Sequence, residues 1–142
     1  MMVTLARAKL NFKLRIMSKS VVYSENAPEP IGPYSQAIQV NNMLFVSGQI
    51  AIQRSTGKMI FDNITDETAQ VMKNISEVLK AAGMNFSNVV KTSIFLKDMN
   101  NFPQVNEHYG TYFSNEPPAR ETVEVSRLPK DANVEISCIA VK

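Results

Sequence analysis

The sequence has almost none of the side chains from which disulfides and transition-metal sites are built. Its 142 residues include one cysteine, Cys138, and one histidine, His108. A single cysteine excludes a disulfide within the chain, and one cysteine with one histidine cannot supply the four ligands of a structural zinc site. No acidic loop has the ligand spacing of a calcium site. We therefore expect a protein that binds no metal.

Long apolar runs and an excess of basic charge in the body of the chain are missing as well. No apolar run approaches the roughly 20 residues that a membrane-spanning helix needs, so we expect no membrane insertion. Residues 1–20 carry five of the 15 basic side chains and no acid, which leaves ten basic and thirteen acidic side chains, a net charge of −3, in the rest. A negative body disfavours binding to nucleic acid.

The length suits one domain behind an N-terminal extension. Residues 1–18 mix Leu, Ile and Phe with isolated basic residues, as organellar transit peptides do. The other interpretations are an upstream start codon, ahead of a shorter protein that begins at Met17, and a flexible tail. We expect residues 19–142 to form a single domain in the cytoplasm, or in a mitochondrion or another organelle if the extension is a targeting segment.

Hydrophobic periodicity predicts a sheet and two amphipathic helices. Residues 37–40 and 43–50 read as strands joined by a two-residue turn at Asn41-Asn42. Residues 65–83 repeat apolar side chains at helical spacing, with Thr65 as the expected N-cap and Gly83 at the exit. A second helix is expected within residues 100–114, capped by Asn101.

Further strands are expected at residues 88–96, 119–125 and 133–141. In the first of these the more apolar set is even-numbered: Val90, Thr92, Ile94 and Leu96. With one further strand, not assigned to particular residues, before the first helix, the order of elements is β-β-β-α-β-α-β-β. This order predicts an α+β domain in which a mixed sheet carries both helices on one face. The other face of such a sheet needs water or a partner.

The last two strands read as a hairpin, and strand parity then pairs two charged residues. If the apolar side chains of both strands share the core face, Arg120 and Glu135 become neighbours on the opposite face. They could form a solvated salt bridge of small energetic value. Alternatively, Arg120 could bind a carboxylate while Glu135 handles a proton or a water. Parity alone does not choose between these interpretations.

Several linked motifs resemble one protein family. They are "IGPYSQAI" (31–38), "VSGQI" (46–50), "VKTSIFLKDMNNFPQVNEHY" (90–109), "PPAR" (117–120) and "VSRLPKDANVEISCIAV" (125–141). In order and spacing they resemble the RidA/YjgF family, also called the L-PSP endoribonuclease family. The resemblance extends from about Lys19 to Lys142.

The resemblance implies a chorismate-mutase-like fold that forms homotrimers with clefts between subunits. It also implies a 2-iminobutanoate/2-iminopropanoate deaminase, which hydrolyses reactive enamines and imines such as 2-aminoacrylate to 2-keto acids and ammonia without a cofactor. An endoribonuclease or translation inhibitor, and a non-catalytic trimer that binds small carboxylates, are the alternative functions.

Residue roles follow from the same resemblance. Arg120 would hold the substrate carboxylate, and Glu135 would position the attacking water. Tyr34 would line the cleft, and Ser47 and Gly48 would form its wall.

Two further positions complete the set of substrate-binding residues that the resemblance implies. Asn88 matches a polar position before a strand. Thr122 stands where many members have cysteine, and its backbone N–H could reach the ligand. Cys138 is expected in the core and His108 on the surface of the second helix.

Overall fold

A computed structural model describes residues 17–142 of the protein. The targeting segment predicted for residues 1–18 therefore lies outside the described residues, except for its last two. Among the described residues, no helix is long and apolar enough to cross a membrane.

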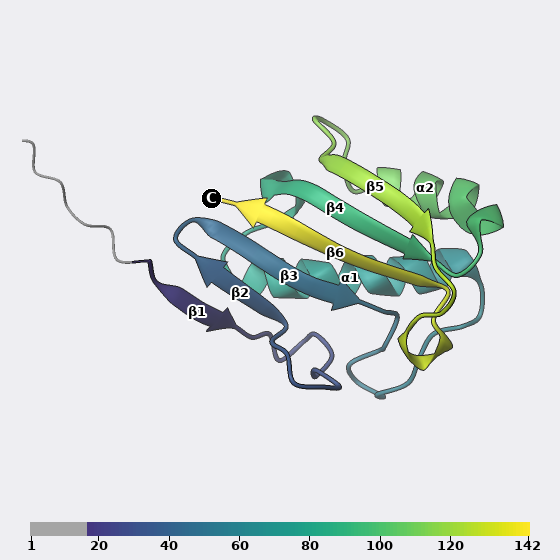
Figure 1. Ribbon diagram of the computed structural model, residues 1–142, viewed down its shortest axis with the longest axis horizontal. Coiled ribbons are helices and arrows are strands. Elements are labelled where there is room, and N and C mark those ends of the chain that lie inside the picture. Colours follow the sequence, from purple (N-terminus) through teal and green to yellow (C-terminus); the bar gives the residue numbers. More distant parts are fainter. Residues whose placement is uncertain (1–16) are drawn as a thin grey trace, which may run out of the picture.

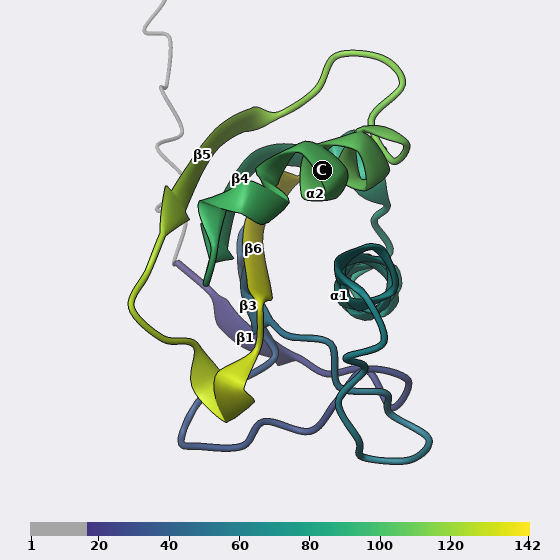
Figure 2. The ribbon, with the colours of Figure 1, turned by 90° about the vertical axis from the view of Figure 1, so that its right-hand side faces the viewer.

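The described chain forms one six-stranded mixed sheet with two α-helices (Figure 1). Its elements are β1 (Lys19–Val22), β2 (Ala37–Val40), β3 (Met43–Gln49), α1 (Ile64–Ala81), β4 (Val89–Leu96), α2 (Phe102–Gly110), β5 (Ala119–Glu124) and β6 (Val134–Val141). The strands are ordered β1-β2-β3-β6-β4-β5. Figure 2 shows both helices on the same side of the sheet. The predicted α+β class and order of elements are confirmed.

The β2–β3 hairpin and α1 form where the sequence predicts them. Asn41 adopts the left-handed conformation that a two-residue turn requires (φ 53°). In α1 the predicted apolar stripe is buried against the sheet. The predicted N-cap is wrong: Asn63, not Thr65, is extended and accepts a hydrogen bond from the backbone N–H of Asp66.

A register shift in β4 overturns part of its predicted core face. The pairing of β4 with β6 slips between Val89 and Lys91. Because a slip of one residue exchanges the two faces of a strand, Val89 is buried and Val90 is exposed. From Thr92 onward the even-numbered side chains face the core, as predicted.

The predicted hairpin between the last two strands does not exist. The β5 strand lies at the sheet edge, parallel to β4, and β6 lies between β3 and β4 (Figure 1). The chain reaches β5 from β4 through α2, the helical crossover that a parallel pair requires. Arg120 is therefore paired with Thr92 of β4, not with Glu135 of β6.

The two faces of the sheet consequently separate the two predicted catalytic residues. Thr92 is buried toward the helices, and side chains paired across a ladder share a face, so Arg120 lies on the helix side. In β6 the even-numbered residues are buried, and Glu135 points away from the helices. We call this second side, which neither helix covers, the open face. The apolar side chains of the predicted strand 119–125 were expected on the core face, but one of them, Val123, lies on the open face and is 40% exposed.

Candidate functional site

Four of the seven predicted site residues surround one cavity of about 300 Å³. Its lining residues come from the loop before β2, from β3 and its exit, and from β6 and the turn before it: Ile31, Tyr34, Ser47, Gly48, Ile50, Pro129 and Glu135. Polar groups therefore share the cavity with apolar walls, as in small-molecule sites.

Gly48 makes room for the carboxylate of Glu135. The β3–β6 ladder is irregular between Val46 and Gln49, and Glu135 fills the space beside the glycine. A Cβ atom at position 48 would lie 2.8 Å from Glu135 Cδ and closer still to its Oε1. The absence of a side chain at position 48 thus lets the Glu135 carboxylate occupy this place, and the backbone there is not left-handed.

Burial raises the pKa of the Glu135 carboxyl above its ordinary value of 4.5. Among residues 17–142 the side chain has no ion-pair partner to offset this desolvation. A carboxylate that is partly removed from water and unpaired binds a proton more tightly, which makes it a stronger base. Glu135 therefore has the environment of a general base.

Ser47 and Tyr34 are fixed by contacts within the cavity wall. The Ser47 hydroxyl donates to the Ser35 carbonyl at 2.6 Å, and its backbone N–H donates to the Gln36 carbonyl at 3.0 Å. The Tyr34 hydroxyl accepts from the Ile31 backbone N–H at 3.2 Å. Ser47 thus fastens the segment that carries Tyr34 to β3, and its hydroxyl is already engaged.

Arg120 lies outside the cavity, against α2. One of its guanidinium nitrogens donates to Asn106 Oδ1 at 2.7 Å. The guanidinium carbon lies 5.7 Å from the ring centroid of Phe102 and 5.2 Å from that of Tyr109, within cation–π range. These contacts fix the group while its other donors stay exposed on an edge strand.

Neither of the other two predicted site residues lines the cavity. The Thr122 hydroxyl is buried on the helix side of the sheet, without a hydrogen-bond partner among the described residues. Asn88 accepts from the Asn85 backbone N–H and donates to the Val141 carbonyl. Val141 is the last residue of β6 and Glu135 the second. Val141 and Glu135 therefore lie roughly 20 Å apart at about 3.3 Å per residue. The contacts of Asn88 are structural.

Sequence reasoning missed three residues of the cavity: Ile31, Ile50 and Pro129. Each stands inside or directly beside a motif that was recognised, but an isolated Ile or Pro carries no signal of its own. Only their position around Glu135 identifies them.

His108 lies on α2, on the helix side of the sheet and outside the cavity. Its Nε2 is 3.3 Å from the Tyr112 hydroxyl, and the two rings pack edge to face. The side chain is half-buried, so the expected position on the surface of the second helix is only partly met.

If the cavity is a catalytic site, the His108→Gln variant should keep the wild-type activity, because the substitution removes a titratable group that does not line the cavity. Steady-state assays of both proteins across pH 6–8 test this. A lost limb of the pH profile would contradict it.

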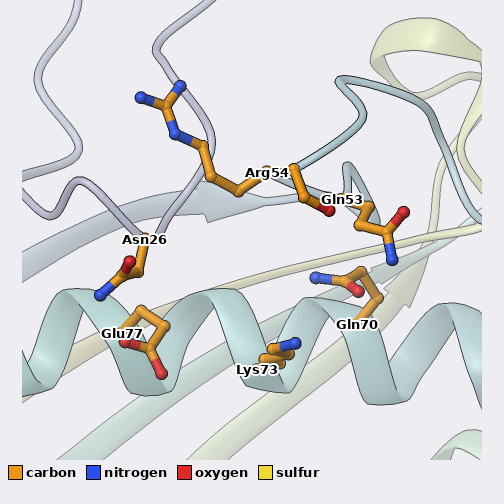
Figure 3. Close-up of a pocket in the computed structure, with 7 residues that line it drawn as sticks. Asn26, Gln53, Arg54, Gln70, Lys73 and Glu77 are labelled. Carbon is orange, nitrogen blue, oxygen red and sulfur yellow. The ribbon is translucent and has the colours of Figure 1, made fainter.

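A larger hollow of about 450 Å³ lies beside α1 and contains none of the predicted site residues (Figure 3). In Figure 3, Gln53 and Gln70 face one another, and Arg54 points away from the helix. Two of its charged groups are already paired: Arg54 with Glu29 and Glu77 with Lys80, both at 2.8 Å. Among the described residues, no group of three or more possible metal ligands occurs in this hollow or elsewhere.

The chain matches known proteins over most of the described residues. The family model described as "Endoribonuclease L-PSP" matches residues 24–142. The chain belongs to the endoribonuclease L-PSP family. The resemblance inferred from the five motifs is thus confirmed.

Named proteins and solved structures are similar to the chain over most of its length. The protein is 47% identical to chloroplastic Reactive Intermediate Deaminase A of Arabidopsis thaliana (94% of this chain, 71% of that protein). It is 46% identical to 2-iminobutanoate/2-iminopropanoate deaminase of Mus musculus (87% and 92%). The YjgF gene product of E. coli matches with a TM-score of 0.83 at 40% identity (87% and 98%). E. coli TdcF, solved with bound serine, matches with a TM-score of 0.83 at 34% identity (87% and 98%).

Proposed function

We propose that this L-PSP family protein is a 2-iminobutanoate/2-iminopropanoate deaminase. The observation that carries the proposal is the unpaired, half-buried carboxylate of Glu135, whose raised pKa suits a general base, in a cavity shaped around it by Gly48. The names of the mouse and Arabidopsis relatives support the same activity. The chloroplastic name of the latter also supports the organellar alternative for residues 1–18.

The proposed reaction is a hydrolysis in two stages. An enamine first tautomerises to the imine, whose protonated nitrogen makes the carbon electrophilic. Glu135 then removes a proton from water as the water oxygen bonds to that carbon, and the C=N π electrons move to nitrogen. In the second stage the Glu135 carboxylic acid returns the proton to nitrogen. A lone pair of the hydroxyl oxygen forms the C=O bond as the C–N bond breaks and ammonia leaves. The Glu135 carboxylate accepts the hydroxyl proton and passes it to ammonia, so that the products are the 2-keto acid and an ammonium ion.

Arg120 would bind the substrate carboxylate through paired N–H donors. Within one chain it lies on the helix side of the sheet, whereas Glu135 lies on the open face. We therefore propose that the two residues of one site come from neighbouring copies in a homotrimer.

Exposed apolar side chains on the open face support the assembly part of this proposal. Four of them, between 38% and 64% exposed, lie on strands β1, β3 and β5: Val21, Met43, Phe45 and Val123. An apolar sheet face of this kind favours burial against another protein surface.

The deciding experiment generates imines in place. An amino-acid oxidase acting on alanine or 2-aminobutyrate supplies 2-iminopropanoate or 2-iminobutanoate, and ammonia release is followed with and without the protein. Release faster than the spontaneous rate supports the deaminase. Thermal stabilisation by keto acids without turnover would favour a non-catalytic carboxylate-binding trimer, and the bound serine of TdcF motivates that arm. RNA cleavage by highly purified protein that is lost in Arg120→Ala would favour the endoribonuclease.

Arg120→Ala should raise KM about 10- to 100-fold, because the charged hydrogen bonds to the substrate carboxylate are lost. The matched control is Arg54→Ala, which removes a guanidinium from the hollow beside α1.

A mixture of the two inactive variants tests whether each site uses two subunits. When Arg120→Ala and Glu135→Gln chains are unfolded together and refolded, about a quarter of the sites should contain both wild-type residues and regain activity. No recovery in demonstrably mixed oligomers would contradict the shared site.

A further inference from the structure

The carboxylate of Glu67 is completely buried in the first turn of α1. An isolated carboxylate in an apolar interior is costly unless hydrogen bonds or an opposite charge offset its lost hydration. No basic side chain pairs with it among residues 17–142. The N-terminus of the helix favours a negative charge at this place. Both hydrogen-bond donors to the Glu67 carboxylate come from a single residue.

That residue is Asn133, which precedes β6. One carboxylate oxygen accepts from the Asn133 backbone N–H at 2.7 Å, and the other accepts from its side-chain Nδ2 at 2.8 Å. The Asn133 carbonyl accepts from the Lys97 backbone N–H at 3.0 Å, just after β4. Asn133 is thus fixed at three points: its backbone N–H and side-chain amide bind Glu67 of α1, and its carbonyl binds the backbone of Lys97.

Asn133 lies between two parts of the candidate cavity. Before it, Lys130 and Asp131 both have positive φ, 53° and 57°, a conformation that non-glycine residues adopt at an energetic cost. Pro129, at the start of this turn, lines the cavity. After it, Glu135 follows two residues on, as the second residue of β6. The hydrogen bonds from Asn133 to Glu67 fix the chain between this strained turn and Glu135.

The same helix holds the opposite wall. Asn74, seven residues after Glu67 and therefore on the same side of α1, is buried and donates to the carbonyls of Ile50 and Ile52, both at 3.0 Å. Ile50 lines the cavity. Two buried polar side chains of α1, Glu67 and Asn74, are thus directed at the two chain segments that form the cavity around Glu135.

We propose that Glu67 is a positioning residue, whose carboxylate fixes Asn133 and thereby sets the place of the Glu135 carboxylate in the cavity. The inference rests on the proposed function for its kinetic consequence. A purely structural role is the alternative, in which Glu67 would stabilise the fold without affecting the chemistry.

Three variants separate these roles in the full-length protein. Glu67→Ala removes both acceptors, and we expect kcat to fall on the order of 10- to 100-fold, as for small displacements of a catalytic group, while KM changes little. Glu67→Gln keeps an acceptor for the Asn133 backbone N–H and should recover part of the loss. Asp66→Ala, which removes the neighbouring first-turn carboxylate without a contact to Asn133, should leave kcat unchanged.

A second readout does not depend on turnover. NMR titration of the ¹³C-labelled Glu135 carboxyl, assigned by its absence in Glu135→Gln, reports the surroundings of that group directly. The titratable side chain that shares the cavity with it is Tyr34. We expect the pKa of Glu135 to fall toward its ordinary value in Glu67→Ala, where the carboxyl gains water, and to stay raised in Asp66→Ala.

The two readouts distinguish failure of this inference from failure of the proposed function. The wild type could lack deaminase activity while the pKa of Glu135 still shifts in Glu67→Ala. In that case Glu67 does position Glu135, and the assigned reaction is wrong. Reduced thermal stability with unchanged kcat and unchanged Glu135 titration would overturn the positioning role. If Glu67→Ala does not fold, Glu67→Gln decides, because it still loses the acceptor of Asn133 Nδ2.

Discussion

Glu135→Gln should lower kcat by about 10²- to 10⁴-fold, the range that general acid–base catalysis contributes. The amide has nearly the same shape but cannot take a proton from water, so KM should change little. The measurement is steady-state ammonia release with imine generated in excess. In the wild type, kcat should also fall as the pH is lowered through the raised pKa of Glu135, because only the carboxylate form is a base.

The same variant should not be less stable at neutral pH. Because the folded-state pKa of Glu135 is raised, the charged form is disfavoured by folding, and its cost is fully present above the folded pKa. That cost disappears below the ordinary value of 4.5, where both states are protonated. Thermal unfolding should therefore show Glu135→Gln at least as stable as wild type at pH 7, with the difference shrinking at lower pH. Full turnover in Glu135→Gln would contradict the assigned role, and Glu107→Gln on α2 is the matched control.

Gly48→Ala should disable the site while leaving the fold intact. The added methyl group would overlap the Glu135 carboxylate, which is the far end of a flexible side chain and can swing away. The backbone at Gly48 is not left-handed, so alanine brings no conformational strain of its own. We expect kcat to fall on the order of 100-fold, as a displaced catalytic group does, with a cooperative unfolding transition retained.

Gly110→Ala is the control for this substitution. Gly110 ends α2, and a Cβ atom there would meet nothing within 4 Å. This variant should keep wild-type activity and gain slightly in stability, because alanine loses less backbone entropy than glycine in a helix. Unchanged activity in Gly48→Ala would show that the Glu135 carboxylate is not needed at its present position.

Local chemistry made much of this fold predictable. The turn at Asn41-Asn42, the apolar stripe of α1 and the exit at Gly83 are each determined by residues a few positions apart. The N-cap of α1 was misassigned because Thr65 and Asn63 are both good capping residues. The hydrogen bond to Asp66 decides between them, and it is visible only in three dimensions.

The sheet order could not be derived from strand parity. Parity correctly separates the buried and exposed sides of β6, but it does not say which strand lies beside it. The nine residues between β5 and β6 are long enough for a hairpin, which is why the two strands were expected to pair. In the structure β6 instead lies between β3 and β4, where both of its edges are hydrogen-bonded. One wrong pairing placed Arg120 and Glu135 on the same face.

The candidate site was predictable only in part for a related reason. The motifs carrying Tyr34, Gly48 and Glu135 identify residues that do meet in one cavity. The contact between Glu67 and Asn133, through which we propose that Glu135 is positioned, joins two residues that are 66 positions apart in the chain. No periodicity or motif signals that contact, and a glutamate in the first turn of a helix is ordinarily explained by the helix dipole alone.

The central place of β6 also governs how the chain can fold during its synthesis. The β1–β3 meander and the β4–α2–β5 unit meet in the sheet only through β6, which pairs with β3 on one edge and β4 on the other. The ribosome makes this strand after all the others. The two halves of the sheet therefore wait as separate pieces with open strand edges, exposed to wrong pairing, until residues 134–141 have emerged and can bridge them.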